Sequence, residues 1–239
     1  METTDGRRGA LVGALTDTGC RFNAHDLLWV ADPASYSSES DMPAWATGAW
    51  LSKAPAVVRR DKRTDPDCIP VGMRGATREQ RHNAHLRRGS VARWATPEML
   101  TQAAVLDDAR RLAQFAAIDA LLKIAPVLDA LQLAWGPTGS VGFTLASGIV
   151  VLRPTSDLDL VIRAPQALER GMIDALCAMH AHAHCRLDMQ IDTGHGAFSL
   201  AEWAQGRRQV LLKTDSGPVL TDTPWDEPAR PVNLVERPA

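Results

Sequence analysis

An alternating acidic segment, Ser156-Asp157-Leu158-Asp159-Leu160, constrains the fold of this chain more than any other feature. In an extended strand, successive side chains point to opposite faces, so Asp157 and Asp159 share one face while the leucines enter a core. Two neighbouring carboxylates repel each other unless a cation neutralises them. Oxygen ligands of this kind suit Mg²⁺, which takes its other ligands from water and substrate phosphates. The segment therefore predicts a half-buried strand with a metal-binding polar face.

Two further motifs flank this strand. A Gly139-Ser140 pair lies upstream of it, and Arg186–Ile191 downstream reads as another alternating strand. On the polar face of that strand the period of two places both Asp188 and Asp192, and either could supply a third carboxylate. Two Mg²⁺ ions held by such a set can clamp the attacking and leaving oxygens of a phosphoryl transfer.

The remaining patterns predict an α+β fold in two parts, a small basic module at 21–90 and a larger mixed-sheet domain with flanking helices at 96–224. The expected strands are 56–60, 69–75, 148–152, 157–162, 186–191 and 210–214. The expected helices run from Thr77 towards Arg88 and over 105–122, 165–180 and 198–204, with a bend or a new helix at Pro126. The ends, 1–20 and 224–239, read as tails.

The charge is unevenly distributed along the chain. The net charge is only −2, which gives no case for a general nucleic-acid binder. From Lys53 to Arg93, however, eleven Lys and Arg stand against four acids, an excess of seven positive charges. Beside an acidic metal site, this excess indicates a partner rich in phosphates or carboxylates.

Four scattered cysteines, with no Cys-x-x-Cys spacing, do not form a disulfide or zinc pattern. The first residues lack the apolar stretch of a secretory signal, and no apolar run approaches the length of a membrane span. We therefore expect a cytoplasmic protein with no membrane partner.

The order of these elements resembles the polymerase-β-type nucleotidyltransferase superfamily. In that superfamily a glycine-serine turn grips the triphosphate, and carboxylates on two strands hold two Mg²⁺ ions. Gly139 and Ser140 match the turn, and Asp157 and Asp159 match the first carboxylate strand. The spacer at 141–156 is longer than usual, which suggests a hairpin around Gly148.

Longer blocks of the sequence resemble one family in particular, the phosphoribosyl-dephospho-CoA transferases (holo-acyl-carrier-protein synthases) of malonate decarboxylase. The blocks are His25–Trp29, Val57–Arg60, Val71–Gly75, Trp135–Phe143, Ser156–Leu160, Asp188–Gln190, Gly196–Trp203 and Leu212–Thr214. The resemblance covers about 25 to 225 of the chain.

This resemblance implies transfer of the phosphoribosyl-dephospho-CoA group from 2'-(5''-triphosphoribosyl)-3'-dephospho-CoA to a serine of the apo acyl-carrier subunit, with release of diphosphate. Asp157, Asp159 and Asp188 would be the catalytic residues and Mg²⁺ ligands, with Asp188 beside the attacking serine. Gly139 and Ser140 would bind the β- and γ-phosphates. Among the basic residues, we expect substrate contacts from Arg59, Arg60, Arg74 and Lys213.

Several alternatives remain open from the sequence. A nucleotidyltransferase of the same fold could use ATP to adenylylate a protein or small molecule. A non-catalytic module that binds carrier proteins, or a nucleic-acid binder acting through 53–93, would belong to other classes. The residues His180, His182, His184 and Cys185 could bind metal, although a helix end explains them more simply.

Overall fold

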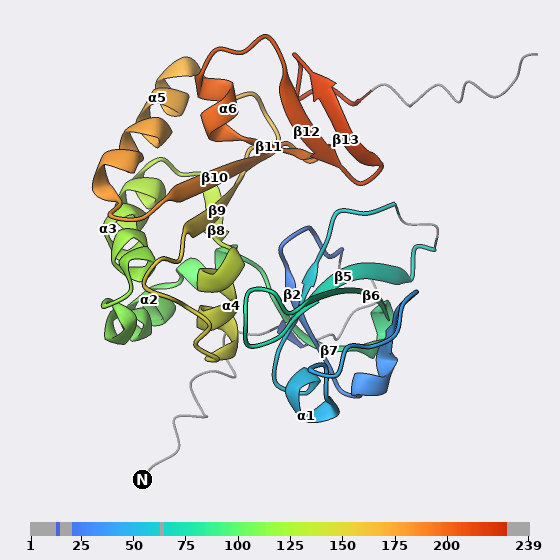
Figure 1. Cartoon of the computed structure of the whole chain (residues 1–239). Coiled ribbons are helices and arrows are strands. Elements are labelled where there is room, and N and C mark those ends of the chain that lie inside the picture. The colour runs from blue at the N-terminus through green and yellow to red at the C-terminus, as the bar shows by residue number, and fades with distance from the viewer. Residues whose placement is uncertain (1–12, 15–20, 63–64, 229–239) are drawn as a thin grey trace, which may run out of the picture.

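The computed structural model describes residues 13–14, 21–62 and 65–228, which form two β-sheets (Figure 1). The first sheet has seven strands and the second has six, and helices accompany both. This architecture confirms the expected α+β fold class. Most of the predicted tail at 1–20 and the end of the chain from 229 lie outside the described residues.

The first sheet is antiparallel, in the order β1-β7-β2-β4-β5-β6-β3. Its core contains Phe22, Leu28, Ile69, Val71 and Leu86, all nearly inaccessible to solvent. A short helix, α1 (Gly48–Leu51), packs Leu51 onto it. The strands are β1 (Gly13–Ala14), β2 (Leu27–Val30), β3 (Tyr36–Ser37), β4 (Ala56–Val58), β5 (Cys68–Arg74), β6 (Arg81–Arg87) and β7 (Val91–Ala95).

The second sheet has the order β13-β12-β11-β10-β9-β8. The neighbours β9 and β10 are parallel and are connected through helix α5 (Arg170–Ala178), whereas all other neighbours are antiparallel. The strands are β8 (Ala134–Pro137), β9 (Leu158–Arg163), β10 (Leu187–Asp192), β11 (Ala197–Ser199), β12 (Val210–Thr214) and β13 (Gly217–Thr221).

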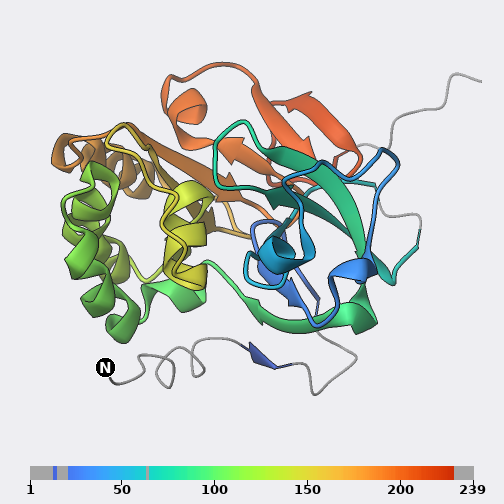
Figure 2. The same cartoon turned by 60° about the horizontal axis from the view of Figure 1, so that its bottom comes forward.

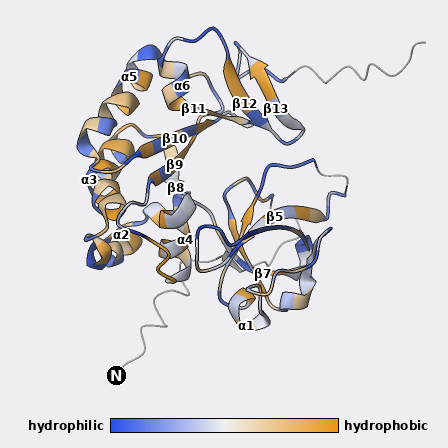
Figure 3. Cartoon of the chain, viewed as in Figure 1, coloured by the Kyte–Doolittle hydropathy of each residue, from blue (hydrophilic) through white to orange (hydrophobic). Residues whose placement is uncertain are grey.

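Helices α3 (Ala116–Ala130) and α5 cover the side of the second sheet that faces away from the first sheet, as the turned view shows (Figure 2). Helix α4 (Gly139–Ser147) instead lies next to the first sheet, with its Phe143 against Arg74 of β5. Helix α3 buries Ile118, Leu121 and Leu128 at helical spacing in one core with Leu158 and Leu160 of β9. Figure 3 shows hydrophobic and hydrophilic positions mixed along α3 and α5, as expected for helices with one buried face. The longer helices are α2 (Ala103–Ala109), α3 (Ala116–Ala130), α4 (Gly139–Ser147), α5 (Arg170–Ala178) and α6 (Leu200–Ala204).

Short 3-10 helices link several of these elements, over Pro33–Ser35, Arg88–Ser90, Glu98–Thr101, Arg110–Leu112 and Met179–His182. A helix with the length and apolarity needed to span a bilayer does not occur within the described part of the chain.

The helix expected from Thr77 towards Arg88 is wrong, because this segment forms a hairpin. Gly75 N–H donates to the Gln80 carbonyl at 2.9 Å, and Thr77 N–H donates to Gln80 Oε1 at 3.1 Å. These bonds close the turn, and β6 then pairs with β5 along its whole length. Long-range pairing overrides the weak local preference of this stretch.

Two other expected elements also differ. No strand forms at 148–152, and the predicted hairpin around Gly148 is absent; Gly148, at φ 72°, instead ends helix α4, with its N–H bonded to the Thr144 carbonyl. The helix expected at 105–122 is interrupted between Ala109 and Ala116, although apolar spacing continues through the break. Helix α3 runs past Pro126, at the loss of one backbone hydrogen bond.

Candidate active site

Asp157 directly precedes β9 and Asp159 is its second residue, and the structure confirms the alternation predicted for this segment. Leu158 and Leu160 are almost fully buried in the core beneath α3, whereas the two aspartates are only partly buried. Because the leucine face is covered by helices, the carboxylate face points the other way, towards the first sheet.

The pairing of β9 with β10 distinguishes the two candidates for the third carboxylate. Asp188 is the direct register partner of Asp159 in the parallel pair, so their side chains lie on the same face of adjacent strands. Asp192 is four residues further along and pairs with Arg163 in register. At the Asp159 end of this face, the acidic group therefore consists of Asp157, Asp159 and Asp188, whereas Asp192 lies at the other end of β10.

The turn before α4 is held tightly against Asp159. Thr138 N–H donates to the Asp159 carbonyl at 2.8 Å, and Gly139, the first residue of α4, has φ +57°. A Cβ at position 139 would lie 2.0 Å from Asp159 Oδ2. Glycine is therefore required here both by its backbone conformation and by the close approach of the carboxylate. The neighbouring Ser140 is partly buried.

The electrostatics of Asp159 reflect this crowding. Burial raises the pKa of its carboxyl, and the negative charges of Asp188 and Asp157 raise the pKa further, against the opposing effects of Arg186 and Arg78. Mutual repulsion of this kind is relieved by a cation.

The chemistry of the three carboxylates fits Mg²⁺, although they are not assembled into a complete site. Among the described residues, no three His, Cys, Asp or Glu side chains are positioned to hold a metal ion together. Mg²⁺ commonly binds one or two carboxylates and completes its shell with water and substrate phosphates. The arrangement is consistent with ions that enter together with a phosphorylated substrate.

Two cavities adjoin Asp159 between the sheets. The smaller, of about 140 Å³, contains Gly139, Ser140 and four arginines, namely Arg74, Arg78, Arg81 and Arg153. The larger, of about 360 Å³, shares Arg74, Arg81, Gly139 and Asp159 with the first and adds His25, Arg59, Thr138 and Gln190. The acidic strand of the second sheet thus faces cations that come mainly from the first sheet.

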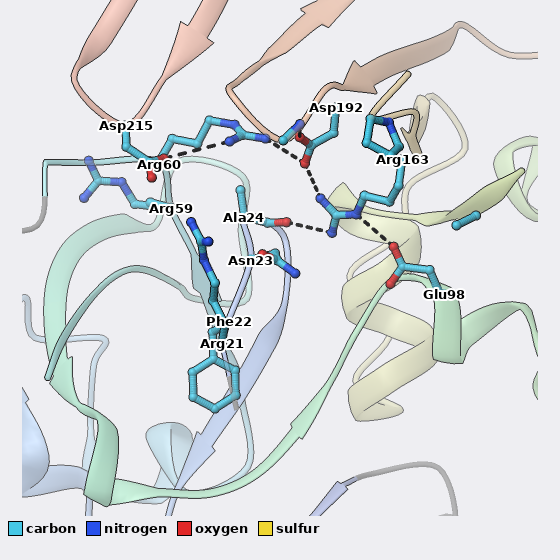
Figure 4. A pocket seen from close by; sticks show the side chains of 13 residues that line it. Arg21, Phe22, Asn23, Ala24, Arg59, Arg60, Glu98, Arg163, Asp192 and Asp215 are labelled. Carbon is cyan, nitrogen blue, oxygen red and sulfur yellow. Dashed lines mark hydrogen bonds and ion pairs between the residues drawn. The ribbon is translucent and has the colours of Figure 1, made fainter. Parts of the chain in front are cut away.

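A third cavity, of about 420 Å³, lies at the far end of β9 and β10 (Figure 4). Asp192, which is 7 % exposed, forms ion pairs there with Arg163 and, at 2.8 Å, with Arg60. Arg163 also reaches Glu98 at 2.9 Å, and Arg60 lies 3.8 Å from Asp215. Burial alone would raise the pKa of the Asp192 carboxyl, but Arg60, the Gly194 N–H and Arg163 outweigh burial and lower it. We call the five charged residues Arg60, Arg163, Asp192, Glu98 and Asp215 the ion network.

The structure therefore separates the basic residues singled out in the sequence. Arg59 and Arg74 line cavities that contain Asp159, although Arg59 also borders the third cavity, whereas Arg60 belongs to the ion network. Lys213 is exposed on β12 and is absent from the linings of all three cavities. The substrate-binding arginines expected from the sequence did not include Arg78, Arg81 or Arg153. For Arg78 and Arg81 the available signal was the glycine-bounded turn after Arg74, because a hairpin there brings the following residues back beside Arg74.

Comparison with known families places these observations in context. Residues 23–97 match the family described as Phosphoribosyl-dephospho-CoA transferase MdcG N-terminal domain, and residues 103–224 match the corresponding C-terminal domain. No solved structure matches this chain.

Curated relatives match along most of the chain. A protein named phosphoribosyl-dephospho-CoA transferase from Pseudomonas fluorescens (strain Pf0-1) is 41% identical over 203 residues, which is 85% of this chain and 94% of that protein. Proteins of the same name from Azotobacter vinelandii (41% over 209 residues, 86% and 95%) and Pseudomonas aeruginosa (39% over 201 residues, 84% and 92%) are similarly related. The chain therefore belongs to the phosphoribosyl-dephospho-CoA transferase family and is a transferase.

Proposed function

We propose that this enzyme transfers the phosphoribosyl-dephospho-CoA group of 2'-(5''-triphosphoribosyl)-3'-dephospho-CoA to a serine of the apo acyl-carrier subunit of malonate decarboxylase. The family supports the transferred group, and the site supports phosphoryl chemistry that depends on Mg²⁺. We also propose that it works in the cytoplasm, where its three described cysteines, all unpaired, would remain reduced.

One observation carries this proposal: Asp159 is the meeting point of all the parts that such a reaction needs. The Gly139-Ser140 turn contacts it on one side, Asp188 lies beside it on the next strand, and an arginine-lined cavity opens in front of it. This arrangement matches what transfer from a triphosphate requires, which is mainly positioning and neutralisation of charge.

In the proposed reaction, the carrier serine oxygen attacks the α-phosphorus of the donor. A bond forms between that oxygen and phosphorus, the bond from phosphorus to the oxygen bridging to the β-phosphate breaks, and diphosphate leaves with the electron pair. Asp188 would accept the serine proton, and Asp157 and Asp159 would hold the metal ions. When bound, Mg²⁺ would neutralise charge on the attacking and leaving oxygens.

The substrate contacts follow from the cavities. Gly139 and Ser140 would donate backbone and hydroxyl hydrogen bonds to the phosphates at the start of α4. Arg59 and Arg74 are placed to contact the donor. Arg60 is already paired with Asp192, and Lys213 lies outside these cavities, so the geometry supports no direct contact from either residue.

A transfer assay read by mass spectrometry tests the proposal. The protein is mixed with Mg²⁺, the apo carrier subunit and triphosphoribosyl-dephospho-CoA, with ATP as a parallel donor and EDTA as the metal-free control. We expect a carrier mass gain equal to phosphoribosyl-dephospho-CoA, lost with EDTA and in Asp157→Asn and Asp159→Asn. A gain of AMP alone would instead support adenylylation, and no gain with either donor would refute transfer to this carrier.

A further inference from the structure

Arg74 is a buried charge without a counter-ion. Its side chain is only 4 % exposed, it forms no ion pair with any described residue, and its Nε has no hydrogen-bond partner. Its guanidinium carbon lies 4.9 Å from the centre of the Phe143 ring in α4, which offers a weak cation–π contact. Burial, together with the charges of Arg81 and Arg153, lowers the pKa of Arg74 to about 10.

Two more arginines converge on Arg74. Arg81 is its direct register partner across the β5–β6 hairpin, so the two side chains leave the same face of adjacent strands. Like charges placed opposite each other destabilise a sheet. Arg153 approaches from the segment between α4 and β9, on the second sheet's side, and lines the same cavity.

The carboxylates nearby do not offset this concentration of charge. Arg153 has one acidic neighbour, Glu79, at 3.9 Å, and both side chains of that pair are largely exposed at 53% and 74%. An exposed pair at this distance contributes little. Asp157 and Asp159 line the same cavity, but neither forms an ion pair with Arg74, Arg81 or Arg153.

A multiply charged anion would satisfy all three arginines at once. We propose that Arg74, Arg81 and Arg153 form a subsite for a diphosphate group, with Arg78 at its rim, and that this subsite binds diphosphate without any metal ion. Arginine suits this role because it stays charged and binds phosphate oxygens through paired N–H groups.

The identity of the ligand rests on the proposed function, while the anion site itself does not. In the proposed reaction, the group bound here would be the β- and γ-phosphates of the donor and then the diphosphate product. The hairpin of the first sheet would therefore hold the leaving group, and the carboxylates of the second sheet would hold the metal ions.

Isothermal titration calorimetry with inorganic diphosphate, in EDTA and at fixed salt, tests the subsite. We expect binding to the unmodified protein, and affinity at least about tenfold weaker in Arg81→Met and Arg153→Met, because each removes a charge-assisted contact. Arg74→Met should show the same loss of affinity. If that variant folds poorly, the variants at the exposed residues Arg81 and Arg153 still test the subsite. Arg87→Met is the matched control, since Arg87 is an exposed arginine at the other end of β6.

A second pair of variants separates this subsite from the metal site. Asp157→Asn and Asp159→Asn remove negative charge from the same cavity, so diphosphate binding in EDTA should persist or strengthen. No binding by the unmodified protein in EDTA would overturn the proposal, as would equal affinities in Arg81→Met, Arg153→Met and Arg87→Met. Diphosphate binding without carrier modification would leave the subsite standing and remove the proposed reaction, whereas the reverse result would remove only the subsite.

Discussion

Two groups of arginines lie between the same two sheets, and they differ in one respect. In the ion network, Arg60 and Arg163 are matched by Asp192, Glu98 and Asp215. In the proposed subsite, Arg74 and Arg81 face each other across a hairpin, and no described carboxylate forms an ion pair with either.

The difference separates structural charges from charges available to a ligand. In a buried ion pair the mutual attraction offsets much of the cost of desolvation, whereas removing one partner leaves an uncompensated charge behind. The ion network links Arg60, which follows β4 of the first sheet, to Asp192 of β10 in the second sheet. The unmatched arginines carry an energetic penalty in the free protein that a bound anion would relieve, which is a common property of functional sites.

The largest contrast is expected between two aspartates of a single strand. Asp188→Asn removes the carboxylate beside Asp159 and should reduce transfer by about a thousandfold or more with little change in melting temperature. Asp192→Asn should instead lower the stability of the protein, because Arg60 and Arg163 lose their shared partner. Transfer rates and thermal unfolding of both variants would check this, and equal losses of activity in two stable variants would contradict it.

Substitution of one arginine from each group should affect stability differently. Arg163→Met leaves Glu98 without its cation and Asp192 with Arg60 alone, and should lower the free energy of unfolding by about 3 kcal/mol. Arg74→Met removes an unpaired charge and should cost less than about 1 kcal/mol or stabilise the protein. Urea unfolding followed by tryptophan fluorescence measures both. A larger loss in Arg74→Met would show that its cation–π contact matters more than its missing counter-ion.

The hairpin shows what could be read from the sequence and what could not. The alternation of Leu158 and Asp159 predicted the strand and its polar face, because that pattern is local. The opposition of Arg74 and Arg81 depends on the pairing of β5 with β6, and local reasoning gave a helix at that position. The choice between Asp188 and Asp192 likewise needed the register with β9, since both have the same parity along β10.

His25 and Asp26, two adjacent residues near the ion network, should contribute to the free energy of unfolding with opposite pH dependences. Burial raises the pKa of Asp26 from 3.8 to about 7, so its contribution to stability is lost as pH rises towards 7. Burial, with Arg163 and Arg60, lowers the pKa of His25 from 6.5 to about 4, so its contribution is lost as pH falls towards 4. Between these limits the two effects oppose each other.

The substitution Asp26→Asn should remove the opposing contribution of Asp26, so that the contribution of His25 to the pH dependence of stability can be measured alone. In this variant the free energy of unfolding should rise between about pH 4 and 6.5, by on the order of 2 kcal/mol more than in the unmodified protein. Chemical unfolding at a series of pH values measures the two slopes, and the double variant with His25→Gln is the control that should flatten the profile. Parallel profiles for the single variant and the unmodified protein would contradict the opposed shifts.

The smallest effect is expected at Lys213. Its side chain is exposed on β12 and belongs to neither group of arginines, so Lys213→Ala should change transfer by less than about twofold. Arg59→Ala, from the larger cavity beside Asp159, is the comparison and should raise KM more clearly. Steady-state kinetics on both variants would test this difference. A strong defect in Lys213→Ala would show that β12 contributes to substrate binding.

The origin of Arg74 and Arg81 in the first sheet has a consequence for how such a protein can evolve. A recombination event that joined the carboxylate strands to an unrelated N-terminal half would preserve the fold around β9 while discarding the hairpin cations. Such a chimera would also lose Arg60, one of the anchors of the ion network. Selection would therefore favour inheritance of both halves as one unit, and the curated relatives do match across at least 84% of the chain.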